Sequence, residues 1–251
     1  MRELVKEHER IDDLQFRGLK LIQNPESFCF GTDAVLLADF ATVKKNAVVC
    51  DLGTGTGILP LLLYGRHEFL HCDAVEIQPE MADMAARSVQ YNGLEEKIRI
   101  CCGDIRRIRE LLPACAYGTV VCNPPYKKHD SGECNCQDAH ALSRHEQTCT
   151  LEDVCAAAAY LLKNGGRLAM VNHSDRIVDI FETMRRYRLE PKRCRLVQAR
   201  PHTPPYIALV EGVKEGRPYM HWENTLCIYD AAGNINGEIN RIYHQQGEKE
   251  P

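Results

Sequence analysis

The feature that most constrains the fold is a glycine-rich stretch that follows a short apolar run. The run is AVVC at residues 47–50, and the stretch is DLGTGTG at residues 51–57. Apolar residues resume at Ile58. A buried strand, a glycine turn and a helix in this order open an α/β unit. Because glycine takes positive φ at little cost and lets a ligand approach the backbone, we expect a ligand to lie over this turn.

A second polar stretch, NPPY at residues 123–126, follows the apolar run TVVC at residues 119–122. Asn123 is therefore expected just beyond the carboxyl end of a strand. Ligands of open α/β sheets bind at that edge, and the two prolines hold the stretch rigid. A glycine turn and a rigid polar loop at one edge of a sheet predict an active site.

The composition is that of an ordinary globular protein: 251 residues, 44% hydrophobic and 26% charged. The net charge of −4 excludes a general attraction to nucleic acid, so a polyanion site must be a local patch. Thirteen cysteines do not indicate a disulfide scaffold in a chain this long and apolar. The charged N-terminus carries no signal segment, and no stretch reaches the ~18 apolar residues of a membrane span. We expect a cytoplasmic protein with reduced thiols and no membrane contact.

Hydrophobic periodicity predicts one α/β domain with an N-terminal hairpin and helix in residues 1–45, a catalytic core in 46–214 and a tail in 215–251. We expect the hairpin within residues 14–30. Further strands are expected at 47–50, 70–77, 97–102, 117–122, 167–172, 193–199, 206–213 and 226–229, and helices begin near 32, 58, 79, 105, 150 and 174. Three of the cysteines, Cys50, Cys101 and Cys122, fall in these strands and are expected to act as small core residues.

Two carboxylates end expected strands on either side of the next helix. Glu76 closes the strand after the glycine turn, where nucleotide-binding folds place an acid that binds ribose hydroxyls. Asp104 closes the following strand and can accept a hydrogen from an adenine amine. The alternative is that both carboxylates only cap helices.

The run VVCNPPY at residues 120–126 resembles the signature of methyltransferases that act on exocyclic or amide nitrogens. A planar NH₂ group is a poor nucleophile because its lone pair is delocalised. The Asn123 side-chain oxygen and the Pro124 carbonyl can each accept one of its hydrogens, which directs the lone pair at the methyl donor. Pro125 keeps these acceptors rigid, and Tyr126 offers a ring face on which a base stacks. These four residues are the expected catalytic residues.

The order of four motifs is similar to that of the bacterial tRNA1(Val) adenine-37 N6-methyltransferases. The motifs are FCFGTDAVLL at residues 28–37, NPPY at 123–126, ALSRHE at 141–146 and LVEGVK at 209–214, and the resemblance runs from about residue 12 to residue 243. It implies a Rossmann-like fold with a mostly parallel seven-stranded sheet whose last strand is antiparallel. It also implies S-adenosylmethionine as cofactor and tRNA as substrate.

The same resemblance assigns the cofactor contacts. Phe30 and Asp33 would border the methionine end. Asp51, Gly53 and Gly55 would lie beneath the cofactor, together with Thr54 and Gly57 of the same loop. Glu76 would hold the ribose, Asp104 the adenine, and Asn123 would line the cofactor pocket on the side of the acceptor.

Basic residues are concentrated between residues 185 and 200, where seven cations accompany one acid, Glu190. Together with Lys127 and Lys128 beside the polar loop, this run is a candidate phosphate-binding face, with Arg193 and Arg195 as its expected RNA contacts. A solvated helix end is the alternative. A cysteine- and histidine-rich segment at residues 127–149 has no common zinc spacing, so no metal is expected.

Three rival functions are weighed against the sequence. A protein glutamine N5-methyltransferase uses the same four-residue loop, but that family carries an N-terminal helical domain, and only fifty residues precede Asp51 here. A DNA adenine methyltransferase usually adds a large target-recognition region, for which this chain has no room. A non-catalytic RNA-binding protein on a methyltransferase fold is disfavoured by the intact Asn123 loop. We therefore predict an S-adenosylmethionine-dependent adenine N6-methyltransferase that acts on tRNA.

Overall fold

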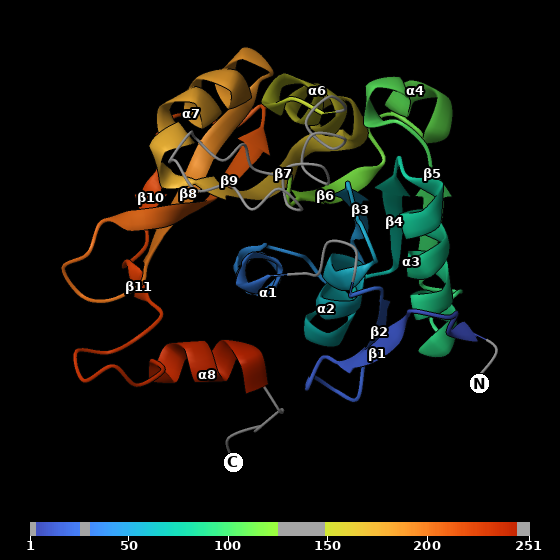
Figure 1. The fold of residues 1–251 in the computed structure, drawn as a ribbon. Helices are drawn as coiled ribbons and strands as arrows, with labels where there is room; N and C mark the ends of the chain where they lie inside the picture. The colour runs from blue at the N-terminus through green and yellow to red at the C-terminus, as the bar shows by residue number, and fades with distance from the viewer. Residues whose placement is uncertain (1–3, 26–30, 125–148, 245–251) are drawn as a thin grey trace, which may run out of the picture.

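The computed structural model describes residues 4–25, 31–124 and 149–244, and it contains a large twisted sheet covered by helices (Figure 1). Its strands are β1 (Arg10–Asp13), β2 (Lys20–Gln23), β3 (Val48–Leu52), β4 (His71–Glu76), β5 (Ile98–Cys102), β6 (Tyr117–Cys122), β7 (Leu162–His173), β8 (Leu189–Gln198), β9 (Pro205–Lys214), β10 (His221–Trp222) and β11 (Leu226–Cys227). Its α-helices are α1 (Thr32–Phe40), α2 (Ile58–Arg66), α3 (Pro79–Tyr91), α4 (Ile108–Leu111), α6 (Leu151–Leu161), α7 (Ile177–Arg186) and α8 (Gly237–His244), with 3-10 turns η2 (Ile105–Arg107) and η3 (Ser174–Arg176).

The strand order in the large sheet is β10-β8-β9-β7-β6-β3-β4-β5, with β11 also paired to β8. Strands β3 to β7 pair in parallel, whereas β9 lies antiparallel between β7 and β8. The seven longer strands β3 to β9 therefore form the mostly parallel sheet that was expected, and the last of them, β9, is the antiparallel one. The described sheet has nine strands rather than seven, because the two-residue strands β10 and β11 extend it along β8.

Two apolar layers sandwich the sheet, as Figure 1 shows with α4, α6 and α7 on one side and α1, α2 and α3 on the other. Alternation along the strands divides their side chains between the layers: Val49 and Val121 pack with α1 and α2, whereas Cys50 and Val120 pack with α6 and α7. Both faces of the central strands are therefore buried, and their carboxyl ends form the accessible edge.

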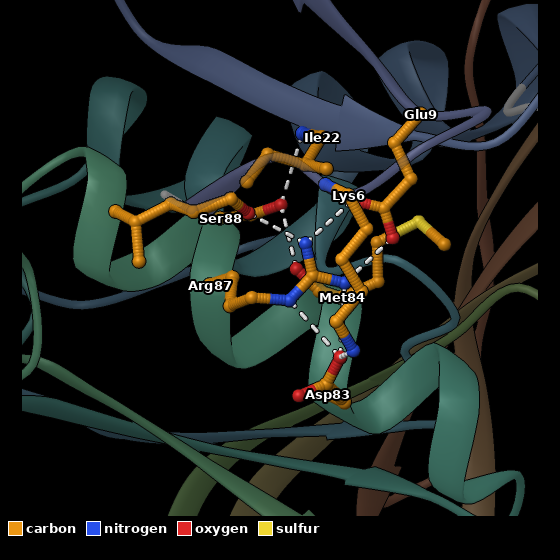
Figure 2. A network of polar contacts seen from close by, with 8 residues as sticks. Lys6, Glu9, Ile22, Asp83, Met84, Arg87 and Ser88 are labelled. Carbon is orange, nitrogen blue, oxygen red and sulfur yellow. Dashed lines mark hydrogen bonds and ion pairs between the residues drawn. The ribbon is translucent and has the colours of Figure 1, made fainter. Parts of the chain in front are cut away.

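The N-terminal hairpin β1–β2 lies against α3 through a polar seam (Figure 2). The guanidinium of Arg87 donates to both carboxylate oxygens of Glu9 at 2.6 and 2.7 Å, while Lys6 pairs with Asp83 at 2.7 Å. The Ile22 amide donates to the Ser88 hydroxyl at 3.0 Å. In addition, the Asn92 side chain bonds both backbone groups of Lys20. The hairpin begins earlier than expected, because its first strand is the polar sequence RIDD, which has no apolar alternation.

Two elements differ from the sequence-based expectation. The strand predicted at 167–172 begins at Leu162, directly after α6, and passes through Gly165 at φ +77°. The register of its pairing with β6 shifts between Leu162 and Arg167, and this irregularity accommodates Gly165 and Gly166. The tail also forms a helix, α8, whose Ile239 and Ile242 are buried in the core.

The strand cysteines are core residues, as expected for two of the three named above. Cys50 and Cys122 are buried, as is Cys72 in β4, whereas Cys101 is half-buried. Burial raises the pKa of Cys50, Cys72 and Cys122 well above the ordinary thiol value. In the part of the chain that the structure describes, no helix has both the length and the apolar character that crossing a bilayer requires.

Candidate active site

The glycine turn and the Asn123 loop leave the sheet side by side. In the parallel ladder of β3 and β6, Leu52 is the Cα partner of Cys122. The residues that follow are Gly53 and Asn123, and adjacent strands of a sheet lie about 5 Å apart. Asn123 and Pro124 are both half-buried. The two loops predicted from sequence to form one site therefore meet at the carboxyl edge.

The glycine turn is fixed by its backbone. The amides of Gly53 and Thr54 donate to the Val75 carbonyl at 2.9 and 3.0 Å, which ties the turn to β4. Gly53 and Gly55 have φ of +77° and +58°, and a Cβ at either would meet no atom within 4 Å. Gly57 at φ +90° has a different reason to lack a side chain, because a Cβ there would lie 3.3 Å from the Cβ of Ala85 in α3. The first two glycines face open space, and the third permits close packing.

Glu76 holds the turn from the neighbouring strand. One oxygen of its carboxylate accepts from the Gly55 amide at 2.8 Å and the other from the Gln78 amide at 2.9 Å. The residue is buried. Each oxygen keeps a second lone pair for a further donor, so the predicted ribose contact is compatible with this geometry and stays a prediction.

Asp51 is the most unusual carboxylate of the site. It is fully buried at the end of β3, and neither oxygen has a hydrogen-bond partner of good geometry among the described residues. Burial and, to a smaller extent, the charge of Glu76 raise the pKa of Asp51 to about 7, although the Thr54 hydroxyl acts in the opposite direction. A buried carboxylate without partners is suited to a cationic ligand nearby.

Asp104 follows β5 and caps η2. Its carboxylate accepts from the Arg106 amide at 2.9 Å and pairs with the Arg106 guanidinium at 2.6 Å. These bonds lower the pKa of Asp104. Asp104 therefore caps a helical turn, which was the alternative considered from the sequence. Its contact with adenine stays a prediction.

Of the other predicted site residues, some lie within the residues that the structure describes and some lie outside them. Asp33 lies in the first turn of α1, half-buried. Phe30, Pro125, Tyr126, Lys127 and Lys128 lie outside the described residues, as does nearly all of the cysteine- and histidine-rich segment. Within the described ranges, no three His, Cys, Asp or Glu side chains are grouped closely enough to hold a metal ion.

The predicted RNA contacts Arg193 and Arg195 are engaged inside the molecule. Arg193 lies between Glu211 and Glu223, at 3.5 and 3.2 Å, and its guanidinium stacks 4.2 Å from the Phe40 ring centroid. Arg195 pairs with Glu238 of α8 at 2.7 Å. Their side chains are only 25% and 13% exposed. Both arginines therefore have structural partners, and a role in RNA binding stays a prediction.

The turn between β8 and β9 reaches the same edge of the sheet, and only its Arg200 belongs to the basic run identified from the sequence. It exposes Arg200, His202 and Tyr206. The pKa of Tyr206 is raised by partial burial and by the charge of Asp33. The antiparallel direction of β9 was predicted, and it alone implies that this turn lies at the carboxyl edge.

The residues at the edge fit S-adenosylmethionine by their chemistry. The cofactor carries a sulfonium and an ammonium group, which match the partnerless carboxylate of Asp51. It also carries ribose hydroxyls, for which Glu76 retains lone pairs. The open space above Gly53 and Gly55 allows a ligand to lie on the backbone.

Comparison with known proteins gives one family. The methyltransferase small domain model matches residues 26–187. A tRNA1(Val) (adenine(37)-N6)-methyltransferase from Bacteroides fragilis strain YCH46 is 30% identical over 200 residues, 78% of this chain and 81% of the relative. Proteins of the same description from Porphyromonas gingivalis strain W83 and Tolumonas auensis are each 29% identical, covering 92% and 89% of this chain and 93% and 92% of the relatives.

Solved structures agree on the fold. A predicted O-methyltransferase from Agrobacterium tumefaciens superposes with a TM-score of 0.70 at 20% identity, over 84% of this chain and 95% of that one. P. horikoshii TYW2, solved in complex with MeSAdo, gives 0.57 at 15% identity, over 84% and 73% of the two chains. The chain belongs to the methyltransferase small domain family and, within it, to the tRNA1(Val) (adenine(37)-N6)-methyltransferases.

Proposed function

We propose that this protein transfers a methyl group from S-adenosylmethionine to N6 of adenine 37 in tRNA1(Val). The observation that carries the proposal is the register of β3 and β6, which sets Gly53 beside Asn123 at one edge. An acceptor nitrogen held by the Asn123 loop then lies next to whatever the glycine turn binds. The activity of the full-length relatives supports adenine and tRNA as the acceptor.

The chain's own residues prepare the nitrogen. The Asn123 side-chain oxygen and the Pro124 carbonyl accept the two hydrogens of the amine, which orients its lone pair. The half-buried position of both residues limits competition from water. When the new N–C bond forms, the amine becomes acidic and releases one proton to solvent, so no strong base is needed.

When bound, the cofactor would supply a methyl group carried on a sulfonium, with a neutral thioether as the leaving group. Asp51 supplies a negative charge beneath the glycine turn. Glu76 keeps that turn in shape through the Gly55 amide, and its remaining lone pairs are available to the ribose. These contacts are expected to bind the cofactor and to orient it toward the acceptor nitrogen.

The test is methyl transfer with labelled S-adenosylmethionine and an unmodified tRNA1(Val) transcript, followed by nucleoside digestion and mass spectrometry. We expect one N6-methyladenosine per tRNA and none in a transcript with guanosine at position 37. Parallel reactions contain duplex DNA and a peptide-release factor. Label in a release-factor glutamine, with none in tRNA, would instead establish the protein N5-methyltransferase reading.

A further inference from the structure

The turn between β8 and β9 lies at the edge where Asn123 lies. Both β7 and β8 pair antiparallel with β9, so β8 runs in the same direction as β6 and β7. The carboxyl end of β8 at Gln198 and the start of β9 at Pro205 therefore reach the carboxyl edge. This turn is one strand beyond the end of β7, which itself neighbours the Asn123 strand.

Hydrogen bonds hold the turn between β8 and β9 in place. The Thr203 hydroxyl donates to the Arg200 carbonyl at 2.7 Å and accepts from the Arg200 amide at 3.2 Å. The Ser174 hydroxyl donates to the Pro205 carbonyl at 2.6 Å, which joins the turn to the end of β7. From the other side, the Tyr229 amide donates to the Ala199 carbonyl at 2.9 Å.

Aromatic rings and a cation are exposed together on this turn. Tyr206 is 41% exposed and Tyr229 39% exposed, and Arg200 and His202 are also exposed. Partial burial, the charge of Asp33 and the presence of Tyr229 raise the pKa of Tyr206. The bond from the Tyr229 amide to the Ala199 carbonyl places Tyr229 beside the turn.

Arg200 differs from the rest of the basic run. Arg185, Arg186, Arg188, Arg193 and Arg195 form ion pairs with acids, and Lys192 donates to the carbonyls of Arg217 and Pro218. Arg200 forms no ion pair with any residue of the described ranges. Among the described residues, it is the cation of the run that no acid neutralises, and it lies at the edge where Asn123 lies.

We propose that Arg200, His202, Tyr206 and Tyr229, the β8–β9 turn surface, bind unpaired nucleotides of the RNA loop that presents the target adenine. Proteins recognise single-stranded RNA loops by stacking splayed bases on aromatic rings and by placing cations against phosphates. Two half-exposed tyrosines and an arginine that forms no ion pair within the described residues provide both. The proposal rests on the proposed function and names the part of the tRNA that this surface contacts.

The experiment measures binding of the unmodified tRNA1(Val) transcript, and of its isolated anticodon stem-loop, by filter binding over a range of salt. Tyr206→Ala is expected to weaken both by about tenfold, with an unchanged salt slope, because stacking on one ring is lost. Arg200→Gln is expected to lower the salt slope by roughly one phosphate contact. Affinity for S-adenosylmethionine, measured by calorimetry, is expected to stay the same in both.

Matched controls come from the same protein. Tyr219→Ala removes a tyrosine that is 89% exposed, and Arg188→Gln removes a cation paired with Glu215 at the opposite end of β8. Neither is expected to change RNA binding. Tyr206→Phe is expected to bind as the wild type, since it retains the ring, and melting temperatures verify that every variant is folded.

The outcomes separate this surface from the proposed function. Wild-type protein that neither binds nor methylates the tRNA contradicts both proposals. Wild-type protein that methylates adenine 37, while Tyr206→Ala and Arg200→Gln bind tRNA as tightly and with the same salt slope, contradicts the surface alone. Loss of binding by Tyr219→Ala or Arg188→Gln to the same extent also overturns it, because the contact would then be non-specific.

Discussion

Three carboxylates stand at the ends of the adjacent strands β3, β4 and β5, and their surroundings differ. Glu76 is bound by two backbone amides and Asp104 by Arg106, so their charges are matched within the chain. Asp51 is buried without such partners. The unmatched negative charge of the site therefore lies directly beneath the glycine turn, where a cationic ligand gains most from it.

Substitution of Asp51 by asparagine is expected to stabilise the ligand-free protein at pH 8 and much less at pH 5. The pKa of Asp51 is about 7 in the folded chain, against an ordinary 3.8. A raised carboxyl pKa means that the folded state binds the extra proton, so stability falls as pH rises between these values, by on the order of a few kcal/mol. Calorimetric melting of both proteins from pH 5 to pH 8 measures the difference.

Asp104→Asn is the control for this experiment. The pKa of Asp104 is lowered by Arg106, so its ionised form stabilises the fold, and that contribution is lost only as pH falls through the lowered value. The asparagine variant is therefore expected to be less stable than wild type at pH 8. If both asparagine variants shift stability in the same direction at pH 8, Asp51 is not held as a destabilising charge.

Asn123→Ala is expected to abolish methyl transfer and to leave cofactor affinity nearly intact. The side chain is predicted to accept a hydrogen from the target amine, so its loss misorients the nucleophile and raises the barrier by more than ~1.4 kcal/mol. Single-turnover rates with tRNA and calorimetry with S-adenosylmethionine separate the two effects. A variant that keeps more than about a tenth of the rate argues against the role.

Among the elements, the hairpin β1–β2 and helix α3 act as one unit. Their contact is polar, and its centre is Arg87, whose side chain is 11% exposed, against Glu9, which is 6% exposed. At the rim, Lys6 is 60% exposed where it meets Asp83. A buried pair is costly to break, because the remaining charge has no partner, whereas an exposed pair contributes little.

Arg87→Ala is accordingly expected to destabilise the protein by about 3 kcal/mol, and Lys6→Ala by less than about 1 kcal/mol. The loss is expected to be local at first. Hydrogen exchange of the Ile22 amide, which donates to Ser88, should accelerate in Arg87→Ala before the core amides do. Equal effects of the two alanines on unfolding by urea would show that the seam has no buried centre.

Elements with strong apolar patterns could be predicted from the sequence, and weakly patterned ones could not. The ends of β3 and β6 follow from VVC runs that precede glycine or asparagine, so the candidate site was predictable in outline. Helix α8 carries only Ile239 and Ile242 as an apolar pair, and the Asn236 side chain that accepts from the Glu238 amide was its one additional signal. Strand β1 contains a single apolar residue, Ile11, and is defined only by its partner.

At the scale of the whole molecule, charges are matched across strands that are distant in sequence. Glu211 of β9 is fully buried and accepts from Arg167 of β7 at 2.6 Å and from the Thr42 amide beyond α1 at 2.8 Å. Arg193 of β8 completes the cluster and also donates to the Phe40 carbonyl. Strand register decides which acid each arginine meets. A run of basic residues in the sequence therefore does not show that these arginines are already paired.

Arg193→Glu is therefore expected to lower the melting temperature by roughly 10 °C, because it sets a third carboxylate beside Glu211 and Glu223. Arg188→Glu reverses a charge that is 76% exposed, and it is expected to change the melting temperature by no more than about 2 °C. Differential scanning calorimetry compares the two. A stable Arg193→Glu protein with weakened tRNA binding would favour the direct RNA contact expected from the sequence.

The buried cysteines allow local unfolding of the protein to be followed by chemical labelling. A thiol reacts through its thiolate, and burial both shields Cys50, Cys72 and Cys122 and raises their pKa. Cys102 and Cys115 are exposed and are expected to react with an alkylating reagent at once. Cys50, Cys72 and Cys122 lie on β3, β4 and β6, and the other buried cysteines of the described residues, Cys155 and Cys194, lie on α6 and β8. In a timed labelling experiment, delayed modification of each cysteine therefore reports when its own strand or helix opens. The native cysteines thus serve as labelling probes that otherwise have to be introduced by mutagenesis.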